Sequence, residues 1–309
     1  MTAKAEAMES IPAAGVKVQM IPVWLQWLWS VRREMWENKA LIYAPAAMCA
    51  LSWVGLVVAI LKAHQVVGGN VTDVRDGLMQ LLGVAAVVIM VTTGIVAVFY
   101  CLDALHSERR DRSVLFWKSL PVGDGTVVLS KAGVAALLLP SITLVVTVIT
   151  HIGLLAILSV SGGVTGLGWW DVWANAALGQ VWLQLAYHLL AIQVLWYAPI
   201  YAYLLLVSAA APRAPILWAV LPPLALSIVE KIAWNTAYLG GLIRERFSGP
   251  FGDHWQAGPM HGTRVILPGV MGSVPAAEFF ASPGLWIGLV VAAVLLFGAT
   301  RVRRYRGPM

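Results

Sequence analysis

The chain has 309 residues, of which 60% are hydrophobic and 12% are charged. Soluble domains carry about 25% charged residues, so this composition excludes a soluble protein and predicts an integral membrane protein. The formal net charge of +6 is not a nucleic-acid signal, because the basic residues gather beside the ends of apolar segments.

The N-terminal region is predicted to contain a tail and an interfacial helix. We expect a cytoplasmic tail at residues 1–20, because they lack the apolar core of a secretory signal. Residues 21–39 repeat with helical periodicity, interrupted on the apolar face by Arg32, whose long stem can snorkel. The apolar face carries Ile21, Trp24, Leu25, Leu28, Met35 and Trp36, and the opposite face carries Gln26, Ser30, Arg33 and Glu37. This pattern predicts an amphipathic helix in the membrane interface, with a cytoplasmic extension of the first span as the alternative.

Six segments approach the roughly 20 apolar residues that a spanning helix needs. The third and fourth are long enough that they must tilt or project beyond the hydrocarbon, and Pro140 and Pro199 are positioned to bend them. The fifth is interrupted by prolines. The predicted spans are about 41–61, 78–102, 132–160, 177–209, 216–234 and 285–300.

The lysine and arginine residues give the orientation. If both termini are cytoplasmic, 15 of the 21 lie on the cytoplasmic side, and most are close to span ends, where the bias is strongest. The sequence therefore predicts a multi-pass membrane protein with both termini in the cytoplasm.

A basic and aromatic loop at residues 107–126, here called the coupling loop, joins the second and third spans on the cytoplasmic side. A loop that meets only water seldom carries consecutive large apolar residues, so this composition predicts docking of a soluble protein, such as a motor subunit. Its basic residues are Arg109, Arg110, Arg112 and Lys118, and its apolar residues are Val114, Leu115, Phe116, Trp117 and Leu120.

An irregular outer segment at residues 235–283 separates the last two spans. It is rich in Gly and Pro, and its apolar stretches are too short to span, which favours short re-entrant helices or an ordered cap. Just before it, Glu230 and Lys231 lie towards the outer end of the fifth span, about 21 Å along the helix from its start.

Several chemistries have no motif in this sequence. There is no phosphate loop, no H-E-x-x-H and no G-x-S-x-G elbow, so we expect no enzyme activity in the chain itself. We also predict no metal site, because Cys49 and Cys101 lie in apolar segments and read as small hydrophobic residues. His151 and His188 lie within spans, where contacts between helices are favoured over a proton relay.

The order of these elements resembles the permease subunit of bacterial ABC type-2 exporters. Residues 32–46, RREMWENKALIYAPA, are similar to the R-E-x-W-E entry to the first span, and residues 111–122, DRSVLFWKSLPV, are similar to the loop after the second span. The resemblance implies an all-α fold with six transmembrane helices, an interfacial helix, a cytoplasmic coupling helix and a re-entrant outer segment. It also implies the bacterial inner membrane. One departure is that 235–283 is longer than two re-entrant helices require.

The resemblance also implies roles for individual residues. A coupling helix would cover about 112–120, end at Pro121 and sit in a groove of the ATPase, with Phe116 and Trp117 as buried anchors. The basic residues would orient the docking or contact acidic lipid; the alternative is that they are topology signals only. The implied coupling set is Arg109, Arg110, Asp111, Arg112, Ser113, Phe116, Trp117, Lys118, Leu120 and Pro121. The candidates for an outer gate or for polar contacts within the membrane are Glu230, Lys231, Glu278 and His188.

The implied partners are two ABC ATPase subunits, which would carry ATP and Mg, a second permease copy or a paralogue, and membrane lipid. The chain itself would hold no cofactor. Two other functions are compatible with the sequence: a scaffold or sensor that docks an ATPase without exporting, and a gradient-driven secondary transporter. An intramembrane enzyme using Glu230 or His188 is disfavoured, because no nucleophile or metal set accompanies them.

Overall fold

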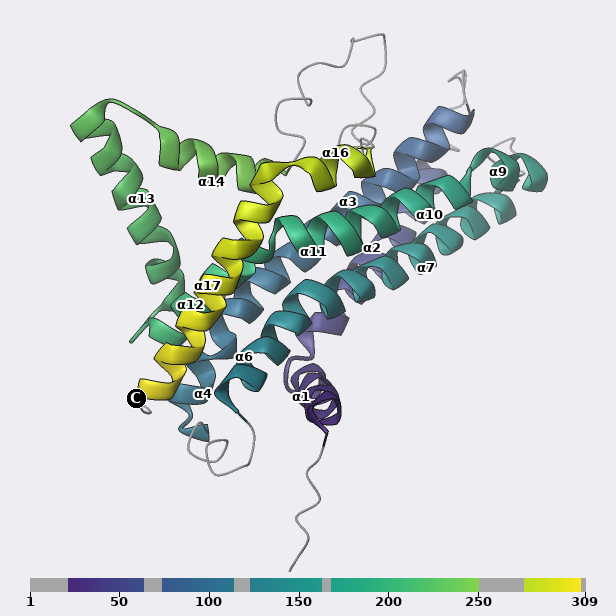
Figure 1. The fold of residues 1–309 in the computed structure, drawn as a ribbon. Coiled ribbons are helices and arrows are strands. Elements are labelled where there is room, and N and C mark those ends of the chain that lie inside the picture. Colours follow the sequence, from purple (N-terminus) through teal and green to yellow (C-terminus); the bar gives the residue numbers. More distant parts are fainter. Residues whose placement is uncertain (1–21, 64–73, 114–122, 163–167, 250–274, 307–309) are drawn as a thin grey trace, which may run out of the picture.

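A computed structural model describes residues 22–63, 74–113, 123–162, 168–249 and 275–306. Every regular element within these ranges is helical, and six helices are long and apolar enough to cross a membrane. The chain is therefore an all-α protein with the character of a multi-pass membrane protein. Figure 1 places α1, α4 and the last turns of α17 at one end of the bundle, the end that the basic residues predict to be cytoplasmic, and α9, α14 and α16 at the other end.

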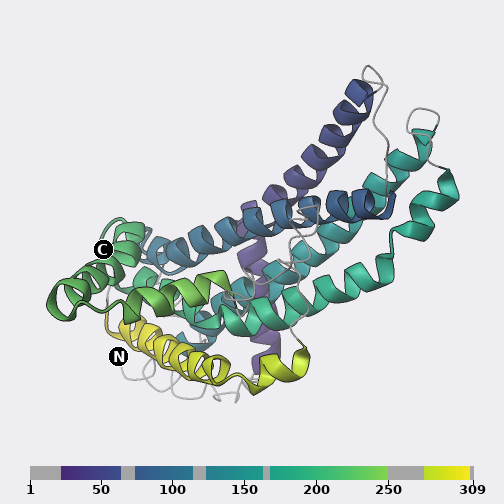
Figure 2. The ribbon, with the colours of Figure 1, turned by 90° about the horizontal axis from the view of Figure 1, so that it is seen from above.

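Helix α1, Val23–Glu37, lies across the end of the bundle rather than along it. Figure 1 views it nearly along its axis while the long helices run across the picture, and Figure 2 shows it from the side. It ends at Asn38, whose backbone N–H and side-chain amide both donate to the carbonyl of Glu34. The chain then turns into α2, Ala40–Ala63, the first apolar helix.

The second and third long helices are α3, Val74–Ala104, and a helical stretch that begins at Asp124. That stretch consists of α6, Asp124–Gly133, the π-helical turn η2, Val134–Leu138, and α7, Leu139–Val160. Pro140 is the second residue of α7, two positions after the end of the π turn. Because proline lacks an N–H and its ring clashes with the carbonyl four residues back, the wider turn accommodates it without breaking the helix.

The predicted fourth span at 177–209 is divided in the structure. A candidate span ends at Trp196, and a shorter apolar helix, α12, follows from Ala198 to Ala210. The division falls at Tyr197, directly before α12. Pro199 is in the first turn of α12, where a helix does not need the N–H that proline lacks. The candidate span is itself built from α9, Trp169–Asn175, α10, Leu178–Tyr187, the π turn η3, His188–Ile192, and α11, Gln193–Trp196.

Helix α13, Pro215–Trp234, stands away from the bundle and keeps Pro222 and Pro223 in its interior. At its outer end the chain turns at Asn235, which has a positive φ of 51°. Helix α14, Tyr238–Ser248, then runs back to the start of α17, Pro283–Tyr305, beside the short α16, Ala276–Ala281. The described part of the outer segment 235–283 thus contains two helices too short to span.

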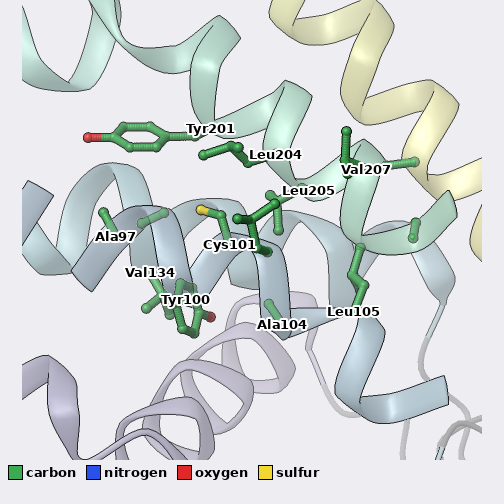
Figure 3. Packing of buried hydrophobic residues seen from close by; sticks show 14 of the residues in the cluster. Ala97, Tyr100, Cys101, Ala104, Leu105, Val134, Tyr201, Leu204, Leu205 and Val207 are labelled. Carbon is green, nitrogen blue, oxygen red and sulfur yellow. The ribbon is translucent and has the colours of Figure 1, made fainter. Parts of the chain in front are cut away.

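The largest apolar core lies between α3, η2 and α12, towards the α1 end of the bundle. Figure 3 shows Tyr201, Leu204 and Leu205 of α12 reaching towards Ala97 and Cys101 of α3. Small residues on α3 allow the two helices to approach closely, which is how helices gain packing energy where lipid supplies no hydrophobic drive.

Helices α2 and α7 fit together through an indole and a glycine. The Trp53 Nε1–H donates to the carbonyl of Thr150, 3.1 Å away, and this places the indole against Gly153, where any Cβ would overlap it. The close approach of these helices therefore requires glycine at position 153.

Replacing Gly153 with Ala tests this contact. Overpacking costs about 1–3 kcal/mol, so we expect a lower midpoint of thermal unfolding for the purified protein in detergent. The matched control is Gly55→Ala in α2, where a Cβ meets nothing within 4 Å; there the loss of backbone freedom in the unfolded chain stabilises by about 0.5–1 kcal/mol. Equal midpoints for both variants would contradict the packing described.

Candidate functional site

The structure describes both ends of the coupling loop but not its middle. The two expected anchors, Phe116 and Trp117, lie outside the described residues, as do three other members of the implied coupling set, Lys118, Leu120 and Pro121. The site that can be built from contacts is therefore the base of the loop, formed by α4, His106–Arg110, with the three residues after it, and by the start of α6.

Helix α4 is tied to the end of α12 at both of its ends. The Ser208 Oγ accepts the backbone N–H groups of Leu105 and His106, each at 3.0 Å. The Arg109 Nη1 donates to the carbonyls of Ala209 and Ala211, at 2.8 and 3.3 Å. Carbonyls at a helix C-terminus carry a partial negative charge and favour a cation. Arg109 is thus buried against α12, and any part it takes in coupling runs through this packing.

The next four residues of the coupling set lie at the surface or near it. Arg110 and Asp111 form an exposed ion pair of 3.1 Å, which contributes little to stability because water screens it. Arg112 is exposed and has a positive φ of 57°, and the Ser113 hydroxyl donates back to the carbonyl of Glu108. The loop therefore leaves the base through a turned, charged segment.

Behind this surface lies a group of five charged side chains, four of them buried and the fifth, Asp124, partly exposed; it is here called the charge cluster. Lys131 Nζ is 2.7 Å from Glu34 and 3.1 Å from Glu108. Arg303 Nη2 is 3.0 Å from the other oxygen of Glu108, and its Nη1 is 2.5 Å from Asp124. These residues come from α1, α4, α6 and α17, so the cluster joins four helices.

The charge cluster is almost completely shielded from water. The side chains of Glu34, Glu108, Lys131 and Arg303 are each only 3–5% exposed, and that of Asp124 is 23% exposed. Burying an ion costs several kcal/mol unless partners and hydrogen bonds compensate. Here each buried base meets two acids, and the Tyr100 hydroxyl of α3 donates to the second oxygen of Glu34 at 2.9 Å.

Arg303 connects the two sides of the coupling loop. Glu108 precedes residues 114–122 and Asp124 follows them, and both carboxylates bind the same guanidinium. The two ends of the loop are therefore fastened to each other through α17, and through Lys131 to helix α1.

This cluster was not predicted from the sequence. Lys131 and Arg303 counted only as topology signals, and the partners are separated by 97 residues for Lys131 and Glu34 and by 195 for Arg303 and Glu108. The sequence does contain a hint that such residues form ion pairs, because charged residues within or directly beside a membrane span are costly and tend to pair. Which acid pairs with which base can be seen only in the folded structure, because the partners are far apart in the sequence.

Comparisons with protein-family models, curated proteins and solved structures found no match. In the part of the chain that the structure describes, no group of three His, Cys, Asp or Glu residues is arranged to hold a metal ion. The function must therefore be inferred from the geometry of the chain itself.

The four candidates for an outer gate or for polar contacts within the membrane do not form a common site. Glu230 accepts hydrogen bonds from the Thr236 hydroxyl and from the N–H groups of Tyr238 and Leu239, at 2.8, 2.6 and 2.9 Å. It thus caps the N-terminus of α14, where a carboxylate satisfies free N–H groups and the helix dipole. Lys231 and Glu278 are exposed, and His188 is half-buried at the start of η3. Within the described ranges no ion pair joins any two of them.

A different residue, Arg246, holds the outer segment to the bundle. Its guanidinium lies over the Trp196 ring, 4.3 Å from the centroid, and donates to the carbonyls of Trp196 and Gly284. The Trp196 indole donates in return to the carbonyl of Arg246 at 3.2 Å. Gly288 makes room, since a Cβ there would overlap the guanidinium. This outer latch, formed by Arg246, Trp196, Gly284 and Gly288, joins α14 to α11 and α17.

Removing Arg303 should destabilise the protein strongly. Arg303→Met leaves Glu108 and Asp124 without their shared cation, and breaking a buried pair costs about 3–5 kcal/mol. The control is Arg301→Met, because Arg301 is an exposed arginine on the same helix. Thermal unfolding in detergent should show a large fall in midpoint for the first variant only. Similar midpoints would mean that the charge cluster does not hold the helices together.

Removing Arg246 should loosen α14 without unfolding the bundle. Arg246→Met deletes the hydrogen bonds and the cation–π contact, so backbone amides of residues 238–248 should exchange with deuterium faster. The control, Arg244→Met, changes an exposed arginine on the same helix. Unchanged exchange in Arg246→Met, measured by mass spectrometry beside the control, would show that the latch does not hold α14.

Proposed function

We propose that this chain is the transmembrane permease subunit of an ATP-driven exporter of the ABC type-2 class. In this proposal two ATPase subunits, carrying ATP and Mg, dock on the coupling loop, and a second permease copy or a paralogue completes the pathway in the bacterial inner membrane. The observation that carries the proposal is the attachment of both ends of the coupling loop to Arg303 of α17.

A loop that transmits force must be stiffly attached to the helices that it moves. At this loop base a push on residues 114–122 would reach α17 through Arg303 and α1 through Lys131 and Glu34. A buried ion pair resists separation, because pulling the charges apart leaves them uncompensated. The charge cluster would therefore move the helices that meet at the loop as one unit.

Helix α17 would carry that movement across the membrane. Arg303 lies in its last turns, and Gly284 and Gly288 of the outer latch lie in its first turns. Between Gly284 and Arg303 a helix rises about 28 Å, close to the thickness of the hydrocarbon. A displacement at the loop base would thus be transmitted through α17 to α14, in the segment that we assign to the outer gate.

Helix α13 provides apolar surface for the second permease copy. Its large side chains are mostly exposed, with Leu217, Leu221 and Leu224 each more than half exposed in the single chain. Lipid can also cover this surface, so it supports assembly into a pair without requiring it.

The double variant Phe116→Ala, Trp117→Ala tests the docking. Each aromatic anchor of an interface contributes at least about 2 kcal/mol, which is about 30-fold in affinity, so a co-purifying ATPase subunit should be lost from native membranes in mild detergent. The control is Trp169→Ala, Trp170→Ala, a pair of exposed aromatics at the opposite end. Full retention of the ATPase by the loop variant, with normal membrane insertion, would overturn the coupling assignment.

Transport in proteoliposomes separates the proposal from its alternatives. An exporter should show substrate accumulation that needs ATP and is lost in the loop variant. A scaffold or sensor would retain the ATPase but move no substrate, and a secondary transporter would follow an ion gradient regardless of Trp117.

A further inference from the structure

Helix α1 turns two different faces to its surroundings. Its inner face places Glu34 in the charge cluster, and Trp27 rests on Gly133 of α6. Its outer face forms a stripe at helical spacing, in which Trp24 is 66%, Leu28 52% and Trp36 71% exposed. The inner contacts fix the rotation of the helix, so the outer stripe is held facing away from the protein.

Arg32 lies in the middle of this stripe between two indoles. Its guanidinium carbon is 5.7 Å from the ring centroid of Trp29 and 5.5 Å from that of Trp36. Trp29 precedes it by three residues and Trp36 follows by four, so all three lie on one side of the helix. In a cation–π contact the aromatic ring lies against the flat face of the guanidinium. The N–H groups at the edge of the guanidinium stay available as hydrogen-bond donors.

The charge of Arg32 has no carboxylate partner among the residues that the structure describes. Its neighbour Arg33 differs, because it pairs with Glu37 and approaches Glu108. Lys39, two residues beyond the helix, is exposed and adds a second positive charge at this end. The stripe is therefore a cationic, aromatic surface. The helix that carries it, α1, lies across the long helices at one end of the bundle (Figure 1).

We infer that Arg32, Trp29 and Trp36 form a binding site for the headgroup of an anionic phospholipid. The planar guanidinium donates two parallel N–H groups to phosphate oxygens, while the indoles and Leu28 contact the glycerol and the upper acyl chains, the depth that tryptophan prefers. The exposed indoles favour a lipid over a soluble phosphate, because they would otherwise face water. The inference is independent of ATP-driven export.

Anionic lipid should be preferred to zwitterionic lipid at this site. Basic residues beside an anionic surface each strengthen binding about fivefold. A choline headgroup carries its own cation, which opposes Arg32 and Lys39, whereas the glycerol headgroup of phosphatidylglycerol does not.

Native mass spectrometry of the full chain, released from mixed micelles of phosphatidylglycerol and phosphatidylcholine, tests this site by counting retained lipids. The wild type should retain phosphatidylglycerol preferentially. Arg32→Gln and Trp36→Leu should each reduce its retention about five- to tenfold, and Arg32→Lys should reduce it less, because it keeps the charge without the planar fork. The control is Arg213→Gln, an exposed arginine between α12 and α13, which should match the wild type.

Three outcomes would overturn the inference. One is equal retention of the two lipids by the wild type, which would indicate general membrane contact. Another is full retention of phosphatidylglycerol by Arg32→Gln, with unchanged thermal unfolding showing that the variant is folded. The third is displacement of the bound lipid by millimolar inorganic phosphate, which would assign the site to a soluble anion.

Discussion

The buried charge cluster is the constraint on which the arrangement of the helices depends. Apolar contacts between membrane helices tolerate changes in how the helices are arranged, because lipid chains can replace those contacts. Charges that are 3–5% exposed have no such freedom, since each needs its partner at hydrogen-bond distance. Placing Glu34, Glu108, Lys131 and Arg303 together fixes α1, α4, α6 and α17 at one point. The cluster therefore specifies an arrangement more than it adds stability, because an apolar core of equal volume would cost less to bury.

Helix α17 links this fixed point to the outer end of the molecule. Its last turns supply Arg303 and its first turns supply the Gly284 carbonyl and the gap at Gly288 that Arg246 fills. Both contacts are polar, specific and short-ranged, whereas the surface between them is apolar packing against α12. A helix held firmly at its two ends transmits a shift or a tilt as a rigid body, so the loop base and the outer latch are mechanically connected although none of the residues that the structure describes touches both.

The sequence predicted the parts of this fold that depend on local pattern. The lengths of the apolar segments predicted six long helices. The helical periodicity of residues 21–39 predicted the helix that is observed as α1, Val23–Glu37. Contacts between distant segments were not predictable: Glu34 lies in a segment recognised by its resemblance, yet its partner is 97 residues away. The break at Tyr197 was missed for a related reason. A proline within an apolar run fits either a bend or the first turn of a new helix, and only tertiary packing decides between them.

Three consecutive residues of α1 show how the parts are connected. Successive residues on a helix differ by about 100°, so Arg32 faces away between its indoles, Arg33 reaches Glu37 and approaches Glu108 at the rim, and Glu34 enters the charge cluster. Helix α1 thus carries the proposed lipid-binding residues on one face and contacts the base of the coupling loop with another. A change in the membrane that shifted α1 would have to move Glu34, and through Lys131 and Glu108 it would move the start of the coupling loop. The same rigidity that would let the loop carry force from the proposed motor would therefore make its position sensitive to the proposed lipid at Arg32.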